Sequence, residues 1–294
     1  MEYNKAISDL AIGDAIEGFY LLRSAQSKIT STGKPFLILT LADRTGAVEG
    51  KVGEYRGSVQ ITVDRIRLAA EGDPVDPASL VPEAPIEQDA AMAEVRRYLA
   101  SIQDPDYRAA AEELLRRHER DFPLIPAAKS VHHGFRMGLL MHTGNMLKIA
   151  DVLAGLYPEV IDRSLLLAGT FAHDLAKARE FQLSELGLAT DYTVAGQLLG
   201  HLVMGAQEAA EVTKALGIPE EKGMLLLHLI LSHHGEPEFG AAVTPACAEA
   251  ELLSYIDGID SRMEICREAL AETETGRFSE RIFALDGRRM YRHE

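Results

Sequence analysis

The order of apolar and polar positions divides the chain into a strand-forming beginning and a helix-forming remainder. Before residue 70, apolar runs alternate with polar turns: Ala15–Ala25 precedes the polar segment SKITSTGKP, and FLILTLAD then has the composition of a buried strand. Asp43–Gly46 predicts a turn, after which AVEGKV and SVQITVDRIRL continue the strand pattern, with a bulge expected at Asp64–Arg65. The pattern therefore predicts a small antiparallel sheet or barrel over residues 1–70.

After residue 90, apolar residues recur at helical spacing instead. The intervening segment 71–90 is rich in proline and acidic side chains, which favours a linker. The expected helices span Ile86–Ile102, Asp106–Arg120, and about 135–156, 163–176, 194–216, 219–234 and 245–270. We therefore predict an α+β multidomain protein, in which a small β domain (1–70) and a linker (71–90) precede an all-α domain (91–294).

Composition and charge narrow the class of protein. The chain is 47% hydrophobic and 26% charged, which is ordinary for a soluble globular protein, and no apolar run is long enough to span a bilayer. The formal charge is −15, and its whole negative excess lies after residue 70, which argues against a generic nucleic-acid coat protein. It still permits a phosphodiester substrate if the pocket itself is positive. The two cysteines, Cys247 and Cys266, favour reduced thiols in a cytoplasm.

Seven titratable side chains stand inside the apolar, helix-like segments, where such residues are uncommon. They are His142, the pair His173 and Asp174, His201, the pair His233 and His234, and Asp257. Each histidine alone is more simply a satisfied core residue, but an unpaired buried carboxylate is costly and the seven together exceed what a core requires. Imidazoles combined with a carboxylate that can bridge two cations predict a metal centre built from several helices.

Three other histidines are expected elsewhere. His118 and His293 are predicted at the surface. His228 shares an apolar segment with His233 but is one residue away from an i, i+4 relation to it, so we expect it in the core or behind the ligands.

Two polar residues near the predicted ligands have alternative interpretations. Lys177 follows Asp174 by three residues, so its ammonium can contact a phosphate oxygen if the helix continues, or extend into solvent from a helix end. Asp260 lies one helical turn after Asp257 and competes with it as the last ligand.

The longer motifs around these residues resemble a known family. The series H…HD…H…HH…D is similar to that of the HD-domain superfamily of metal-dependent phosphohydrolases. From about Glu87 to the C-terminus, the chain resembles the YhaM-type 3′→5′ exoribonucleases, in which an OB-fold precedes an HD domain. The segments that carry this resemblance are VHHGFRMGLLMHT, LLLAGTFAHDLAKARE, LLGHLVMG, LILSHHGEPEFG, EAELLSYIDGIDSRM and FSERIFALDGRRMY. It implies an OB-like β domain, shortened here, before the HD domain.

The resemblance also implies a role for each candidate ligand. One metal would be held by His142, His173, Asp174 and Asp257, and a second by His201, His233 and His234, with Asp174 bridging the two. The family pattern favours Asp257 over Asp260. A mononuclear site that uses four of the ligands is the alternative. The imidazole-rich, thiolate-free set suits two divalent transition-metal ions such as Mn, Fe, Co, Ni or Zn.

The resemblance implies catalytic roles for Asp174 and Lys177, and substrate contacts for His132, His133, Arg136 and Lys177. The expected activity is phosphodiester hydrolysis by metal-activated water, as a 3′→5′ exonuclease acting on single-stranded RNA or oligonucleotides. One alternative is hydrolysis of mononucleotides or other small phosphoesters. Another is a metal-loaded binding module without catalysis. No membrane partner is expected, and the oligomeric state is left open.

Overall fold

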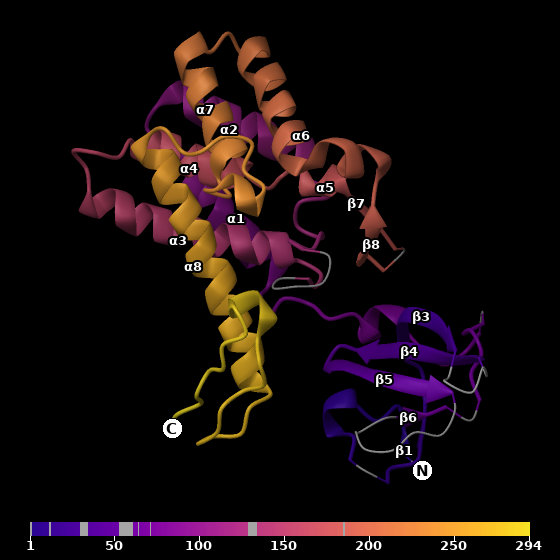
Figure 1. The fold of residues 1–294 in the computed structure, drawn as a ribbon. Helices are drawn as coiled ribbons and strands as arrows, with labels where there is room; N and C mark the ends of the chain where they lie inside the picture. The colour runs from indigo at the N-terminus through magenta and orange to yellow at the C-terminus, as the bar shows by residue number, and fades with distance from the viewer. Residues whose placement is uncertain are drawn as a thin grey trace. The chain divides into compact units, whose positions relative to one another are not determined.

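The fold is taken from a computed structural model, which describes residues 2–294 except for residues 12, 30–34, 53–60, 64, 71, 129–133 and 185. The chain forms two compact units, Met1–Glu83 and Ala84–Glu294. Strands build the first unit and mainly helices build the second, so the predicted class of a β domain before a helical domain is confirmed (Figure 1). The division falls within the segment predicted as a linker, which contains the short 3-10 helix η2 (Pro77–Leu80). The helical unit begins at Ala84 rather than at residue 91.

A four-stranded sheet forms most of the N-terminal unit. Its strands, in spatial order, are β3 (Leu21–Ile29), β4 (Pro35–Asp43), β5 (Gly46–Val52) and β6 (Ile61–Thr62). A separate parallel pair joins β1 (Glu2–Tyr3) to β2 (Ile16–Glu17), and the 3-10 helix η1 (Ile7–Asp9) lies between these two in sequence. β3, β4 and β5 pair antiparallel, whereas β6 runs parallel to β5. The antiparallel expectation is therefore confirmed for three strands and wrong for β6.

The first predicted hairpin differs from the observed one at its ends. β3 begins at Leu21 rather than Ala15 and extends to Ile29, into the segment expected to be a turn, because Ile29 still pairs with Pro35 of β4. The predicted turn after β4 is confirmed: Oδ1 of the buried Asp43 accepts hydrogen bonds from the backbone N–H groups of Thr45 and Gly46.

The last predicted strand ends earlier than expected. β6 ends at Thr62, and the following residues Ile66 and Leu68, expected among the apolar strand positions, are 56% and 84% exposed. Strand pairing with β5 ends at Thr62, so these side chains have no sheet face to cover. Asp64, expected in a bulge, lies outside the described residues.

In the described part of the chain, eight α-helices form the second unit, close to their predicted positions. They are α1 (Gln88–Ala100), α2 (Pro105–His118), α3 (Gly138–Leu156), α4 (Arg163–Ala172), α5 (Lys177–Glu180), α6 (Val194–Ala215), α7 (Glu220–Ser232) and α8 (Ala248–Ala271). The short 3-10 helices η3 (Pro237–Phe239) and η4 (Phe283–Leu285) follow α7 and α8. None of the described helices has both the length and the apolar character that crossing a membrane requires.

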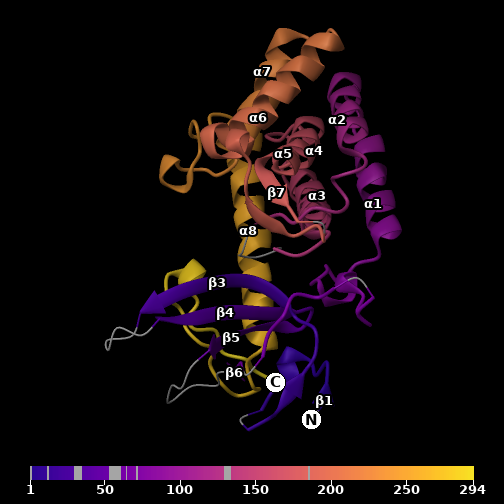
Figure 2. The same cartoon turned by 90° about the vertical axis from the view of Figure 1, so that its right-hand side faces the viewer.

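α4 lies at the centre of the helical unit. All its residues from Ser164 to Ala172 are buried, as expected for a helix that is apolar on every side. It packs against α2, α3, α7 and α8 (Figure 2). Gly169 permits the close approach of α7, because a Cβ atom at this position would lie 2.2 Å from Cδ2 of Leu229. The C-terminal ends of α4 and α7 each lead directly into a pair of predicted ligands.

The helical unit is not all-α as predicted. Between α5 and α6, β7 (Phe181–Leu183) and β8 (Ala189–Tyr192) form a short antiparallel hairpin. Its turn contains Gly187 at φ +77°, a conformation that glycine adopts without steric cost. The buried ring of Phe181 packs against Tyr192 with centroids 5.6 Å apart, and this contact fixes the hairpin locally.

His118 is buried, so the prediction of a surface position is wrong. Its Nε2 lies 2.9 Å from Oε2 of Glu208 on α6, and only 6% of the residue is exposed. The pattern of α2 alone cannot reveal this pairing, because Glu208 lies 90 residues away in sequence. His293 is exposed, as predicted.

Replacing His118 by alanine is expected to destabilise the helical unit. Among the described residues, Glu208 would keep its two longer ion pairs, with Arg117 and Arg179 at 3.8 and 3.9 Å. Loss of a buried hydrogen-bond partner costs on the order of 1–3 kcal/mol, which lowers the Tm of a unit this size by roughly 2–12 °C. Thermal unfolding followed by circular dichroism measures the shift, with His293→Ala as the control. An unchanged Tm for H118A would contradict a stabilising role of this pair.

Candidate metal centre

The seven predicted ligands come from five places in the helical unit. His142 lies in α3, His173 and Asp174 in the turn after α4, His201 in α6, His233 and His234 in the turn after α7, and Asp257 in α8. Ligand atoms of His142, His173 and Asp174 lie within 4.8 Å of one another, and so do those of His201, His233 and His234. Asp257 adjoins the former group, with its Oδ1 3.3 Å from Nε2 of His142. We call His142, His173 and Asp257 the first set, and His201, His233 and His234 the second set.

Asp174 lies between the two sets. Its Oδ2 is 3.2 Å from Nε2 of His173 and 3.8 Å from Nε2 of His142. Its Oδ1 is 3.3 Å from Nε2 of His201 and 3.6 Å from Nε2 of His233. Each carboxylate oxygen thus faces one set of histidines, which is the arrangement that a carboxylate bridging two cations requires.

The site contains buried polar atoms that have no hydrogen-bond partner in the described part of the chain. Within the described residues, the buried side-chain atoms without a hydrogen-bond partner are Thr170 Oγ1, Asp174 Oδ1, the Nε2 atoms of His173, His201 and His233, and Nδ1 of His234. Leaving such a group unpaired costs on the order of 1–3 kcal/mol. All of these atoms except the Thr170 hydroxyl belong to predicted ligands, so the residues fit a site for cations that would act as the missing partners.

Burial controls the protonation of the second set. It lowers the pKa of His201 and His233, and burial together with the neighbouring His233 lowers the pKa of His234 to about 4. A histidine nitrogen must be unprotonated to bind a metal. The second set meets this requirement at neutral pH.

His142 of the first set behaves differently. Burial alone would lower its pKa, but hydrogen bonds with Asp257 and Asp260 outweigh burial and raise the pKa to about 9. The metal-free protein therefore holds a proton on His142 at neutral pH, and a cation bound at this residue would replace that proton.

Lys177 pairs with Asp174 instead of extending into solvent. Its Nζ lies 2.7 Å from Oδ2 of Asp174, and its side chain is 16% exposed. The contact forms although α4 ends at Ala172, because the turn from His173 onward leads directly into α5. Burial would raise the pKa of Asp174, but the charge of Lys177 and the neighbouring His173 and His233 together outweigh burial and hold this pKa well below its usual range. Asp174 is therefore ionised beside a charged lysine.

Asp257 and Asp260 occupy opposite sides of His142. Asp257 faces Nε2, the nitrogen that also faces Asp174. Asp260 Oδ2 lies 2.7 Å from Nδ1 of His142, and its Oδ1 accepts a hydrogen bond from Nδ2 of Asn145 at 3.0 Å. The geometry supports Asp257 as the ligand of this pair and places Asp260 behind the imidazole.

Glu180, at the end of α5, is a residue of the site that the sequence interpretation missed. Its Oε1 accepts hydrogen bonds from both the backbone N–H and Nδ1 of His201, each at 3.0 Å. The sequence signal was weak: Glu180 follows the His-Asp pair closely, but it precedes His201 by 21 residues, and no spacing rule connects the two.

The predicted substrate contacts are placed only in part. His132 and His133 lie outside the described residues. Arg136 packs its side chain beside Gly187 in the β7–β8 turn, with its Cγ 3.5 Å from the position of a Cβ there. His228 accepts a hydrogen bond from the backbone N–H of Ala246 at 2.8 Å, which gives it a structural partner separate from both sets.

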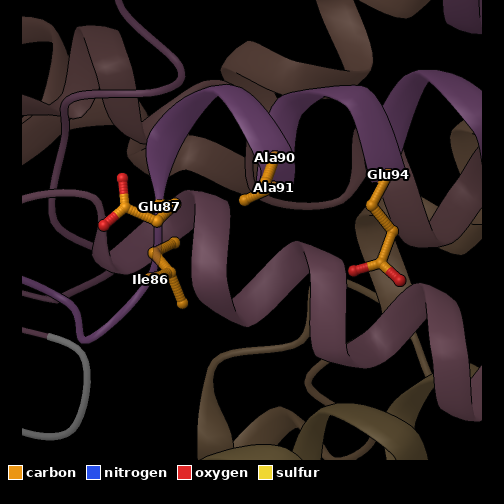
Figure 3. Close-up of a pocket in the computed structure, with 5 residues that line it drawn as sticks. All are labelled: Ile86, Glu87, Ala90, Ala91 and Glu94. Carbon is orange, nitrogen blue, oxygen red and sulfur yellow. The ribbon is translucent and has the colours of Figure 1, made fainter.

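An open surface pocket lies along α1 and the residues before it, with a volume of about 410 Å³. Figure 3 shows its lining, which consists of Ile86, Glu87, Ala90, Ala91 and Glu94. None of these side chains belongs to either set of ligands, so this pocket is not part of the metal centre.

Comparisons with known proteins agree with this arrangement. Residues 139–262, which include all seven predicted ligands, match the HD domain family. The chain is 37% identical over 311 aligned residues to the 3′-5′ exoribonuclease YhaM of Shouchella clausii (strain KSM-K16), covering 98% of this chain and 96% of that protein. The similarity therefore includes the N-terminal unit and is not confined to the region after Glu87. No solved structure matches the chain. The protein thus belongs to the YhaM-type family of HD-domain proteins.

Proposed function

We propose that this protein is a metal-dependent 3′→5′ exoribonuclease that hydrolyses single-stranded RNA. The observation that carries the proposal is the position of Asp174, whose two oxygens face two separate sets of histidines. A relative that is 37% identical over nearly the whole chain and is named as a 3′-5′ exoribonuclease supports the substrate and the direction.

In this proposal each set holds one divalent cation. His142, His173 and Asp257 bind the first, His201, His233 and His234 bind the second, and Asp174 contributes to both. When bound, such cations activate water and stabilise negative charge on phosphoryl oxygens. The histidine-rich ligands and the absence of thiolates among them favour transition metals such as Mn, Fe, Co, Ni or Zn over Mg or Ca.

Lys177 would supply a positive charge next to the two sets. Its ammonium already contacts Oδ2 of Asp174 and is mostly screened from solvent, so it is held at the carboxylate that joins the sets. From there it can pair with a phosphate oxygen of the substrate. The proposed contacts of His132, His133 and Arg136 with the substrate rest on the family resemblance.

An RNA-shortening assay tests the proposal directly. Single-stranded RNA labelled at its 5′ end and incubated with the protein and Mn²⁺ is expected to give a ladder that shortens progressively, while RNA labelled at its 3′ end loses the label in the first steps. Denaturing gel electrophoresis resolves both patterns.

The same assay separates the alternative function. If the protein hydrolyses mononucleotides or other small phosphoesters and leaves RNA at full length, the exoribonuclease proposal is wrong and the small-substrate hydrolase is favoured. Loss of the 5′ label before the 3′ label would contradict the proposed direction.

A further inference from the structure

The four histidines around Asp174 are held by two kinds of partner. Each donates from Nδ1 and so directs Nε2 toward Asp174. His173 donates to the backbone carbonyl of Thr170 at 2.7 Å, and His233 donates to that of Ile230 at 2.8 Å. Both partners lie three residues earlier in the same chain segment, so local backbone geometry orients these two rings.

The other two histidines depend on carboxylates outside the predicted ligand set. His142 donates to Asp260 at 2.7 Å, and His201 donates to Glu180 at 3.0 Å. His142 belongs to the first set and His201 to the second. Each set therefore has one ring whose Nδ1 is held by the backbone and one ring whose Nδ1 is held by a carboxylate.

Glu180 holds His201 in place in a second way. Gly200 interrupts α6 with φ +70° and ψ 163°, so a new helical segment starts at His201 and its backbone N–H has no carbonyl of the preceding turn to bond. Oε1 of Glu180 accepts this N–H at 3.0 Å and so caps the segment while it also orients the ring. The backbone of Glu180 is fixed as well, because its carbonyl accepts the N–H of Thr193 at 2.8 Å.

Each carboxylate oxygen of Asp260 has a partner on α3. Asn145 donates to Oδ1 at 3.0 Å, and Oδ2 receives Nδ1 of His142 at 2.7 Å. The residue is 7% exposed, which keeps water from replacing it as the acceptor.

We propose that Glu180 and Asp260 are positioning residues that each control the affinity of one metal, Asp260 for the first set and Glu180 for the second. This inference rests on the proposed metal-dependent function. Mutations of these two carboxylates should change one metal affinity without the other, while every ligand is kept.

The test is a calorimetric titration of chelator-stripped full-length protein with Mn²⁺. The wild type is expected to bind two equivalents. Asp260→Ala and Glu180→Ala are each expected to weaken one of the two affinities by about 10–100-fold and to leave the other unchanged. Double variants identify the metal site on which each carboxylate acts. E180A combined with H201A should cause no further loss of Mn²⁺ affinity beyond that of H201A alone. D260A combined with H142A should likewise cause no loss beyond that of H142A alone.

Amide variants make the test sharper, because the two carboxylates should respond differently. Asp260→Asn leaves one amide oxygen for two donors. When this oxygen accepts from Asn145, the NH₂ faces Nδ1 of His142 and favours the tautomer with the proton on Nε2, so D260N should weaken the first-set affinity. In Glu180→Gln one oxygen can still accept both donors of His201, so the loss should be smaller, about 3–10-fold. If E180A fails to fold, a wild-type second affinity in E180Q would still overturn the role of Glu180.

Glu208→Gln is the matched control, since it alters a buried glutamate of α6 that pairs with a histidine outside both sets. Both of its Mn²⁺ affinities should equal those of the wild type. Two wild-type affinities in D260A and E180A, or an equal loss at both sites in each variant, would overturn the inference. A wild-type protein that binds no metal would instead refute the proposed function.

Discussion

Asp174→Asn is expected to reduce RNA hydrolysis by on the order of 10³-fold or more, well beyond the roughly 10–100-fold typical of losing a residue that only orients a ligand. The carboxylate has an oxygen for each set, Oδ2 for the first and Oδ1 for the second. An amide has only one oxygen, so its NH₂ group would face one set of imidazole nitrogens and prevent a cation from binding there.

Asparagine is preferable to alanine at this position because the amide oxygen still offers Lys177 an acceptor and avoids leaving a buried ammonium unpaired. Initial rates on labelled RNA with saturating Mn²⁺ measure the effect, and thermal unfolding checks the fold. Asp151→Asn is the control, since that carboxylate pairs with Arg163 at the surface and should leave the rate unchanged. A rate for D174N within tenfold of the wild type would refute the bridging role.

Removing the metals is expected to abolish hydrolysis and to lower the Tm of the helical unit. Each bound cation stabilises the folded state by about 2.7 kcal/mol when its free concentration is a hundred times its Kd. Two such sites together should raise the Tm of a unit of this size by roughly 10–20 °C. The buried nitrogen and oxygen atoms that lack a hydrogen-bond partner are the physical origin of this dependence.

The measurement compares thermal unfolding and RNA shortening of the full chain before chelation, after chelation and after Mn²⁺ is restored. D174N, measured in the same way, should show a smaller rise in Tm on addition of Mn²⁺. Undiminished RNA shortening in excess chelator, together with an unchanged Tm, would exclude a metal-dependent mechanism.

The helices and the ligands could be predicted from the sequence because both depend on local patterns. Apolar periodicity located α1 to α4 and α6 to α8 within a few residues. Histidines and aspartates inside apolar segments are unusual enough that their positions alone identified the residues that the structure brings together around Asp174. The assignment of ligands to two metals came from the family resemblance, and it stays a prediction that the titrations test.

The positioning residues could not be predicted because their contacts depend on how distant helices cross. Asp260 is 118 residues from His142, and Glu180 contacts His201 at an interruption of α6 at Gly200. The burial of His118 against Glu208 has the same cause. Strand ends and the β7–β8 hairpin were also missed, since they depend on pairing partners more than on the composition of the segment itself.

The packing of the hydrophobic core at Gly169 sets the spacing between the two sets of ligands. α4 and α7 come close together there, and the ligand pairs that follow them place the rings of His173 and His233 with centroids 4.8 Å apart. One of these rings belongs to each set, so the spacing of the two sets depends on the packing of two apolar helices. Substitutions at purely apolar positions of α4 and α7 can therefore change the reactivity of the centre in relatives that keep every ligand.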